Sequence, residues 1–168
     1  MKIVSDSTPL IHSAKISRIS LLKNLFNEII ILKEIYKEIV EGKKHGKNEI
    51  LIIEKFIEEK FILIKEPKSV VEIENLDRGE KECISLCKEL NISNILIDEK
   101  EGFYISQLFD STPIRTTSIL IISLDKKIIN LKEYRVLLKK LVDGGYFLDA
   151  LTYERLLNIG RGIVKSRT

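Results

Sequence analysis

Residues 2–11 read KIVSDSTPLI, an apolar run that ends on an acidic residue and then passes into hydroxyls and a proline. The run predicts a short buried strand, Lys2 to Ser5, and Thr8 followed by Pro9 predicts the start of a helix. Asp6 lies between these two elements. An aspartate at such a point usually caps the helix. Because Thr8 and Pro9 already supply a cap and a first-turn proline, a functional role remains open for Asp6.

Short apolar runs of this kind recur along the chain with helical patterns between them, which is typical of an α/β domain with a mainly parallel sheet. Further strands are expected at Glu28 to Leu32, Phe61 to Lys65, Ile95 to Ile97 and Pro113 to Arg115. Helices are expected at Pro9 to Ala14, Ser17 to Leu25, Lys33 to Val40, Glu49 to Glu59, Arg78 to Leu90, Glu99 to Phe109, Thr116 to Lys126, Lys132 to Val142 and Leu148 to Asn158. A polar, glycine-containing loop is expected at 41–49.

Length and composition fit one folded domain. The 168 residues can bury a substantial core, and 44% hydrophobic residues exclude a disordered chain. We expect a domain at 1–157 and a short basic C-terminal tail at 158–168. The net charge of +3 is too small to indicate nucleic-acid binding by itself. The sequence has neither an apolar run of membrane-spanning length nor a signal-peptide pattern at its start, so no membrane association and a cytoplasmic location are expected.

Two of the predicted strands run directly into acidic residues. Asp6 follows the first strand, and Asp98 follows the buried run NILI at 94–97. Ligands of parallel α/β sheets gather at the carboxyl ends of the strands, so these two side chains are expected at the same edge. Asp98 has an alternative explanation as the cap of a helix that begins in EKEG.

Two further acids lie on predicted helices. Glu80 follows Asp77 by three residues, and this capping-box spacing explains the glutamate as well as a functional role does. Glu38 lies at the margin of the apolar face of its helix, but periodicity does not distinguish it from Glu34 or Glu41.

Carboxylates that share one cleft repel one another. Two unit charges about 5 Å apart, at an effective dielectric constant near 20, repel by roughly 3 kcal/mol, so a cluster raises the pKa values of its members or binds a cation. Oxygen ligands favour Mg²⁺ or Mn²⁺ over zinc. Such an ion can activate water for phosphodiester hydrolysis.

The order of these motifs resembles the PIN-domain family, in particular small prokaryotic PIN-like proteins that are predicted to bind nucleic acid. IVSDSTPLI resembles the family's first motif, LKEIYKEIV the second, LDRGEKECISLCKEL the Gly-Glu helix start, and ILIDEKEG the fourth motif. The resemblance implies that the metal ligands and catalytic residues are Asp6, Glu38, Glu80 and Asp98. The second motif thereby selects Glu38, which periodicity could not do.

The chain departs from the family pattern at several positions. Leu32 stands where the family often has proline, and Glu99 replaces the second aspartate of the usual pair. The effective fourth acid could therefore be Asp98, Glu99 or Glu101. Arg115-Thr116 matches the family's Gly-Thr segment without its glycines, and the match implies a substrate-binding role for both residues.

The resemblance further implies a three-layer α/β/α fold, a homodimer, and Mg²⁺- or Mn²⁺-dependent endoribonuclease activity on single-stranded RNA. Many family members are toxins of toxin–antitoxin pairs, which adds an antitoxin protein as a partner. A PIN-like module that binds nucleic acid or protein without cutting is the alternative. A phosphoacceptor receiver domain fits less well, because VSDSTP lacks the paired acids that such domains carry after their first strand.

Overall fold

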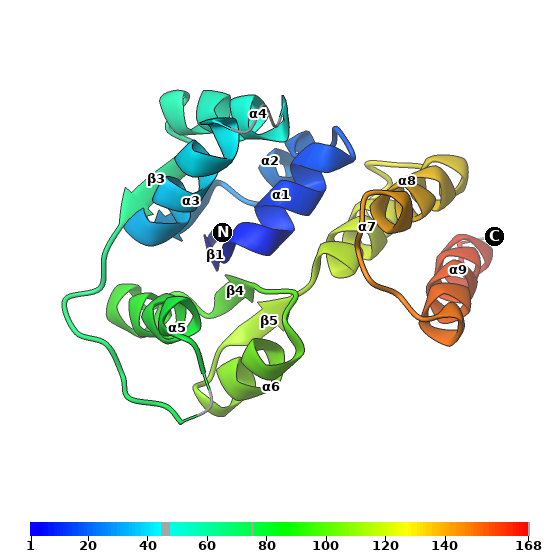
Figure 1. The fold of residues 1–168 in the computed structure, drawn as a ribbon. Coiled ribbons are helices and arrows are strands. Elements are labelled where there is room, and N and C mark those ends of the chain that lie inside the picture. Colours follow the sequence, from blue (N-terminus) through cyan, green and yellow to red (C-terminus); the bar gives the residue numbers. More distant parts are fainter. Residues whose placement is uncertain (45–47, 75, 168) are drawn as a thin grey trace. The chain divides into compact units, whose positions relative to one another are not determined.

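The computed structural model describes residues 1–44, 48–74 and 76–167 (Figure 1). In chain order the elements are β1 (Lys2–Ser5), α1 (Ser7–Lys15), α2 (Ser20–Leu25), β2 (Glu28–Leu32), α3 (Lys33–Lys44), α4 (Asn48–Glu58), β3 (Ile62–Lys65), α5 (Arg78–Leu90), β4 (Asn94–Leu96), α6 (Lys100–Leu108), β5 (Thr112–Ile114), α7 (Thr116–Asp125), α8 (Leu131–Asp143) and α9 (Ala150–Lys165). The loop expected at 41–49 is wrong at both ends, because residues 41–44 continue α3 and residues 48–49 begin α4; residues 45–47 lie outside the described residues.

The chain divides into two compact units, 1–116 and 117–168, and each is described by itself. The first unit holds a five-stranded sheet in the order β3-β2-β1-β4-β5, and every pairing in it is parallel. Helix α5 packs on β1, β2 and β4, whereas α3 packs on β2 and β3 and α4 packs on β3. This arrangement confirms the predicted α/β/α architecture with a central parallel sheet.

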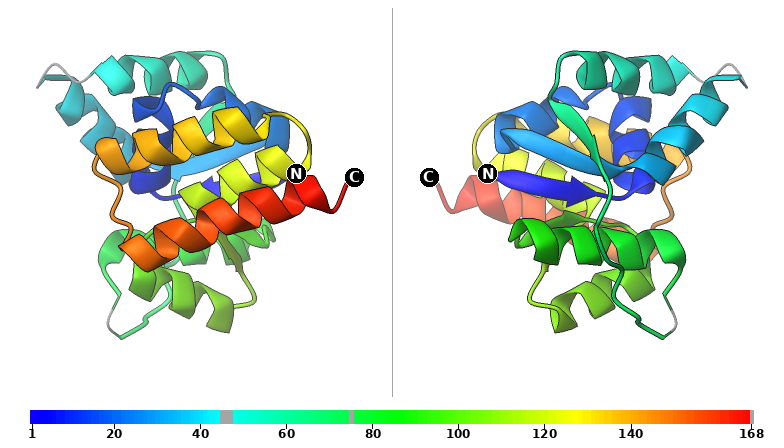
Figure 2. Two further views of the ribbon diagram at one scale, coloured as in Figure 1. Left: turned by 90° about the vertical axis from the view of Figure 1, so that its right-hand side faces the viewer. Right: turned by 90° about the vertical axis from the view of Figure 1, so that its left-hand side faces the viewer.

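The sequence of β2, EIIIL at 28–32, explains why this strand lies inside the sheet, and its last four residues are buried. A continuous apolar run is the pattern of a parallel strand covered on both faces. Its neighbour β1 contributes the fully buried Ile3 and Val4, and β4 contributes Ile95 and Leu96. The right-hand view of Figure 2 shows β1 and β2 side by side.

The strand order places a topological switch point between β1 and β4. From β1 the chain moves outward through β2 to β3 and then returns to β4 on the other side of β1. Val4 pairs with Ile95 and Ser5 with Leu96, and the N–H of Asp6 donates a hydrogen bond to the carbonyl of Leu96 at 3.0 Å. Ligands bind at such switch points in parallel sheets. The residues that follow β1 and β4 are therefore the first candidates for a functional site.

The predicted starts of α1 and α2 are wrong. Helix α1 begins at Ser7 rather than Pro9, with Asp6 in the N-cap position and Pro9 in the first turn, where its missing N–H breaks no bond. Thr8 is therefore not the cap. Helix α2 begins at Ser20 rather than Ser17, because Ser17 adopts a left-handed backbone with φ of 57°.

The second unit contains α8 and α9, which pack against each other (Figure 2). Residues 158–165, which the sequence assigns to a basic tail, continue α9. The expected helix end at Asn158 is wrong because Gly160 does not break the helix but lies against Tyr134. Within the described residues no helix combines the length and apolar character that crossing a membrane requires.

Candidate functional site

A pocket of about 520 Å³ in the first unit collects acidic side chains. Its lining consists of Asp6, Ser7, Thr8, Glu34, Ile35, Glu38, Asp77, Arg78, Gly79, Glu82 and Glu99. These residues come from the segment after β1, from α3, from the start of α5 and from the segment after β4. The pocket thus lies at the switch point between β1 and β4, with carboxylates delivered from both strands and from two helices.

Asp6 stands in the N-cap position of α1, yet its side chain makes no capping hydrogen bond. Burial raises the pKa of Asp6 to about 6; the backbone N–H of Ser7 opposes this shift, and the negative charges of Glu38 and Asp77 add to it. The carboxylate is therefore close to other acids and partly removed from water. This is the electrostatic condition in which a carboxylate gains most from a bound cation.

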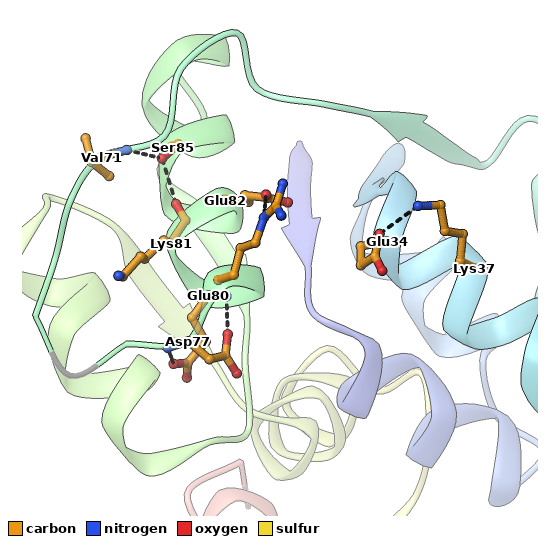
Figure 3. Close-up of polar contacts among 9 residues, drawn as sticks. Glu34, Lys37, Val71, Asp77, Glu80, Lys81, Glu82 and Ser85 are labelled. Carbon is orange, nitrogen blue, oxygen red and sulfur yellow. Dashed lines mark hydrogen bonds and ion pairs between the residues drawn. The ribbon is translucent and has the colours of Figure 1, made fainter.

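Glu80 has two roles in one side chain. The N–H of Glu80 donates to Oδ1 of Asp77 at 2.8 Å, and Oε2 of Glu80 accepts from the N–H of Asp77 at 3.2 Å, which completes the capping box drawn in Figure 3. The other oxygen, Oε1, is buried and has no hydrogen-bond partner among the described residues. Oε1 faces Gly102 of α6, where any side chain would overlap it.

The pKa of Glu80 is raised by burial, and the charges of Asp77, Asp6 and Glu99 add to the shift, while the hydrogen bond from the Asp77 backbone opposes it. Asp77 and Gly79 line the acidic pocket, whereas Glu80, which is adjacent to Gly79 in sequence, does not line it. Glu80 is thus both a structural cap and a buried acid with one uncommitted oxygen.

Asp98 and Glu99 lie differently although they are adjacent. Oδ1 of Asp98 accepts the N–H of Thr116 at 2.9 Å, and its Oδ2 accepts the Thr116 hydroxyl at 2.7 Å. Glu99 occupies the N-cap position of α6 without a side-chain capping bond, and it lines the pocket. Of the three acids that the sequence left open, Glu99 faces the pocket, Asp98 is held by Thr116, and Glu101 is exposed in the first turn of α6.

Arg115, expected to bind substrate, precedes Thr116 at the end of β5. Its guanidinium lies over the ring of Phe103 at 4.4 Å, and its buried Nε has no hydrogen-bond partner in the described part of the chain. The exposed Tyr104 meets Phe103 edge-on. Arg115, Phe103 and Tyr104 therefore form a group of one cation and two aromatic rings at α6 and the end of β5. Strand β5 pairs with β4, and Glu99 follows β4.

Four charged residues of the pocket lining had no functional assignment from the sequence: Glu34, Asp77, Arg78 and Glu82. Two signals could have found some of them. Glu34 and Glu38 are four residues apart, and so are Arg78 and Glu82, a spacing that puts both members of a pair on one helix face. Asp77 was explained fully by its capping role, which it does fulfil.

The donors in this pocket are carboxylate oxygens, which suit Mg²⁺ or Mn²⁺. In residues 1–44, 48–74 and 76–167 no three His, Cys, Asp or Glu side chains converge closely enough to form a ready-made metal site. The uncommitted Oε1 of Glu80 and the raised pKa of Asp6 nonetheless fit a cation, because each marks a carboxylate that lacks a positive partner.

The fold and the pocket define a class: a parallel α/β/α domain with an acidic pocket at its switch point. A PIN-domain family model matches residues 2–160, so the chain belongs to the PIN-domain family. Among solved structures, a PilT N-terminus domain protein from the hyperthermophilic archaeon Sulfolobus solfataricus P2 is similar, with a TM-score of 0.54 and 17% identity over 74% of this chain and 94% of that one. That likeness concerns the fold. No protein of curated function matches the chain.

Proposed function

We propose that the chain is a metal-dependent endoribonuclease that hydrolyses phosphodiester bonds of single-stranded RNA, with Mg²⁺ or Mn²⁺ as cofactor. The observation that carries the proposal is the acidic pocket at the switch point, where Asp6, Glu38 and Glu99 arrive from separate elements. Membership of the PIN-domain family supports it, because PIN domains are generally nucleases.

In this proposal the ion is held by Asp6 and Glu38, with Glu80 contributing through Oε1 and Asp98 as the fourth acid; Glu99 is the substitute if Asp98 is not a ligand. A bound ion lowers the pKa of a coordinated water and offsets charge on the phosphate. With a pKa of about 6, Asp6 is mostly ionised at pH 7.5 and can serve as a ligand there.

Each carboxylate oxygen of Asp98 accepts one hydrogen bond from Thr116, and these bonds are compatible with a ligand role. Metal-binding carboxylates are commonly oriented by hydrogen bonds from neighbouring groups. The hydroxyl and N–H of Thr116 do this for Asp98, which supports a positioning role for Thr116. On the substrate side, Arg115 and the exposed Tyr104 supply a cation and a ring surface of the kind that single-stranded RNA contacts.

We expect the purified protein to cleave a fluorescent single-stranded RNA pool when Mn²⁺ or Mg²⁺ is present. Addition of excess chelator should abolish cleavage, and restoring the ion should recover it. An Asp6→Asn, Asp98→Asn double variant, purified in the same way, is the control for a contaminating nuclease. Cleavage that survives the chelator or the double variant would contradict the carboxylate mechanism.

A PIN-like module that binds nucleic acid or protein without cutting is the second candidate. It is favoured by one observation, the absence of a ready-made three-ligand group in the described residues. Retained RNA binding without cleavage under any of the metal conditions above would establish it in place of the nuclease. The antitoxin partner, the homodimer and the cytoplasmic location stay predictions of the family resemblance.

The role of Asp98 can be separated from that of Thr116. We expect Thr116→Val to lower cleavage about tenfold, the usual cost of losing a group that orients a metal ligand. Asp98→Asn is expected to lower it at least ten times further, because it changes the ligand itself. The cleavage rates of Asp98→Asn, of Thr116→Val and of the variant that carries both substitutions form a double-mutant cycle.

The cycle, together with Glu99→Gln, separates the roles of these residues. If the Asp98→Asn and Thr116→Val rates agree and the Asp98→Asn, Thr116→Val variant is no worse, the two residues act as one unit, and the larger loss expected for a metal ligand at Asp98 is contradicted. If Glu99→Gln is far more damaging than Asp98→Asn, Glu99 is the fourth acid. Retained melting temperatures show that the changes are not caused by unfolding.

A further inference from the structure

Arg78 is a cation in the lining of a pocket otherwise rich in carboxylates. It is the first residue of α5, and its Nε donates to Oε1 of Glu82 at 2.7 Å. The Glu82 side chain is only 14% exposed, whereas that of Arg78 is 90% exposed. The guanidinium is therefore anchored at its Nε edge by a mostly buried acid, while the rest of it faces solvent.

The anchoring bond leaves the two terminal amino groups of Arg78 available. Among the residues that the structure describes, neither amino group has a hydrogen-bond partner. Guanidinium groups bind phosphate through pairs of parallel N–H donors, which a lysine cannot reproduce. Holding Nε in advance also reduces the rotamer freedom that binding a phosphate would otherwise remove.

The pocket around Arg78 is strongly negative, which matters for binding an anionic RNA strand. The lining carries Asp6, Glu34, Glu38, Asp77, Glu82 and Glu99. An RNA strand is itself anionic, so carboxylates near the cut bond repel the phosphates on either side of it. Figure 3 shows Glu82 on α5 and, on α3, Glu34, whose partner Lys37 lies 2.9 Å away. Lys37 is thus hydrogen-bonded to Glu34 on its own helix. The charge of Glu34 also acts on Arg78, but the terminal amino groups of Arg78 form no hydrogen bond with a described residue.

We propose that Arg78 is a positioning residue for the substrate, which holds a backbone phosphate of single-stranded RNA at the mouth of the acidic pocket with its two terminal amino groups. The proposal rests on the proposed ribonuclease function. The competing explanation is an ordinary surface ion pair between Arg78 and Glu82 at i,i+4 spacing, which contributes little to stability and nothing to substrate binding.

The test compares Arg78→Ala and Arg78→Lys with the wild type and with Lys139→Ala. Lys139 is the control because it forms an exposed i,i+4 pair with Asp143, also at 2.7 Å, and does not line the pocket. The probe is one fluorescein-labelled single-stranded RNA. Its affinity is measured by anisotropy in EDTA at several salt concentrations, and its cleavage is measured in Mn²⁺ with kcat and KM determined separately.

We expect Arg78→Ala to raise KM about tenfold, to change kcat by less than about threefold, and to reduce the slope of log affinity against log salt by about 0.7, the value for one lost phosphate contact in a single strand. Arg78→Lys should restore the salt slope but not the full affinity, because it keeps the charge and loses the paired donors. Lys139→Ala should match the wild type in every measurement.

An unchanged KM and an unchanged salt slope in Arg78→Ala would overturn the proposal and leave the ion pair with Glu82 as the explanation. A lower melting temperature without a change in affinity would lead to the same conclusion. If the wild type binds RNA but does not cleave it, the proposed function fails, and the salt slope still decides whether Arg78 contacts a phosphate.

Discussion

Asp6→Asn is expected to reduce metal-dependent RNA cleavage about 10³-fold, a loss of about 4 kcal/mol in transition-state stabilisation. Asn keeps the size and one acceptor oxygen of the side chain but removes the charge that would hold a cation. Among the proposed ligands we expect Asp6 to matter most, because it follows the central strand β1 and its pKa is raised by burial and by the charges of Glu38 and Asp77.

The same substitution should not weaken the fold. Asp6 makes no capping hydrogen bond, and its charge is repelled by its acidic neighbours. Removing that charge in metal-free buffer should leave the melting temperature unchanged or higher, since sites arranged for function are often strained for stability. Asp143→Asn, an exposed acid outside the pocket lining, serves as the control and should keep wild-type activity.

Cleavage rates in Mn²⁺ and melting curves in EDTA together test this account. Lost cleavage with a retained melting temperature supports a functional role for Asp6. Lost cleavage with a markedly lower melting temperature would instead mean that Asp6 acts as a helix cap, the alternative that its backbone position suggests. Wild-type cleavage would remove Asp6 from the site altogether.

The sequence predicted the bounds of those helices and strands that neighbouring residues mark by themselves. The bounds of β1, β2 and α5 were predicted exactly, because an uninterrupted apolar run marks a buried parallel strand and a capping box marks a helix start. The positions of Asp6 and Asp98 directly after two predicted strands also predicted that both residues reach one edge of the sheet. Parallel pairing of β1 with β4 makes this unavoidable.

The orientation of side chains could not be predicted in the same way. Asp98 and Glu99 are neighbours, but the contact of Asp98 with Thr116 joins residues that are far apart in sequence, and it leaves Glu99 to face the pocket. Glu80 illustrates a different limit. The sequence offered capping and function as exclusive alternatives, whereas one oxygen of Glu80 completes the cap and the other remains uncommitted.

Gly160→Ala is expected to destabilise the protein by about 2 kcal/mol, although alanine normally favours a helix interior over glycine by about 1 kcal/mol. A Cβ at residue 160 would lie 2.6 Å from Cε1 and 2.9 Å from Cδ1 of Tyr134. The Tyr134 ring is fully buried, and its hydroxyl donates to the carbonyl of Leu156 at 2.9 Å. Burial raises the pKa of Tyr134 to about 12, so the hydroxyl remains a donor at neutral pH.

Gly162→Ala provides a matched control on the same helix, because nothing lies within 4 Å of a Cβ at that position. Here only the helix preference acts, and the substitution should stabilise the protein by about 0.5 kcal/mol, less than the full value because α9 ends at Lys165. Urea unfolding of the two variants should therefore shift in opposite directions. If Gly160→Ala is as stable as Gly162→Ala, Tyr134 can move away from α9, and close packing does not explain why the helix continues through Gly160.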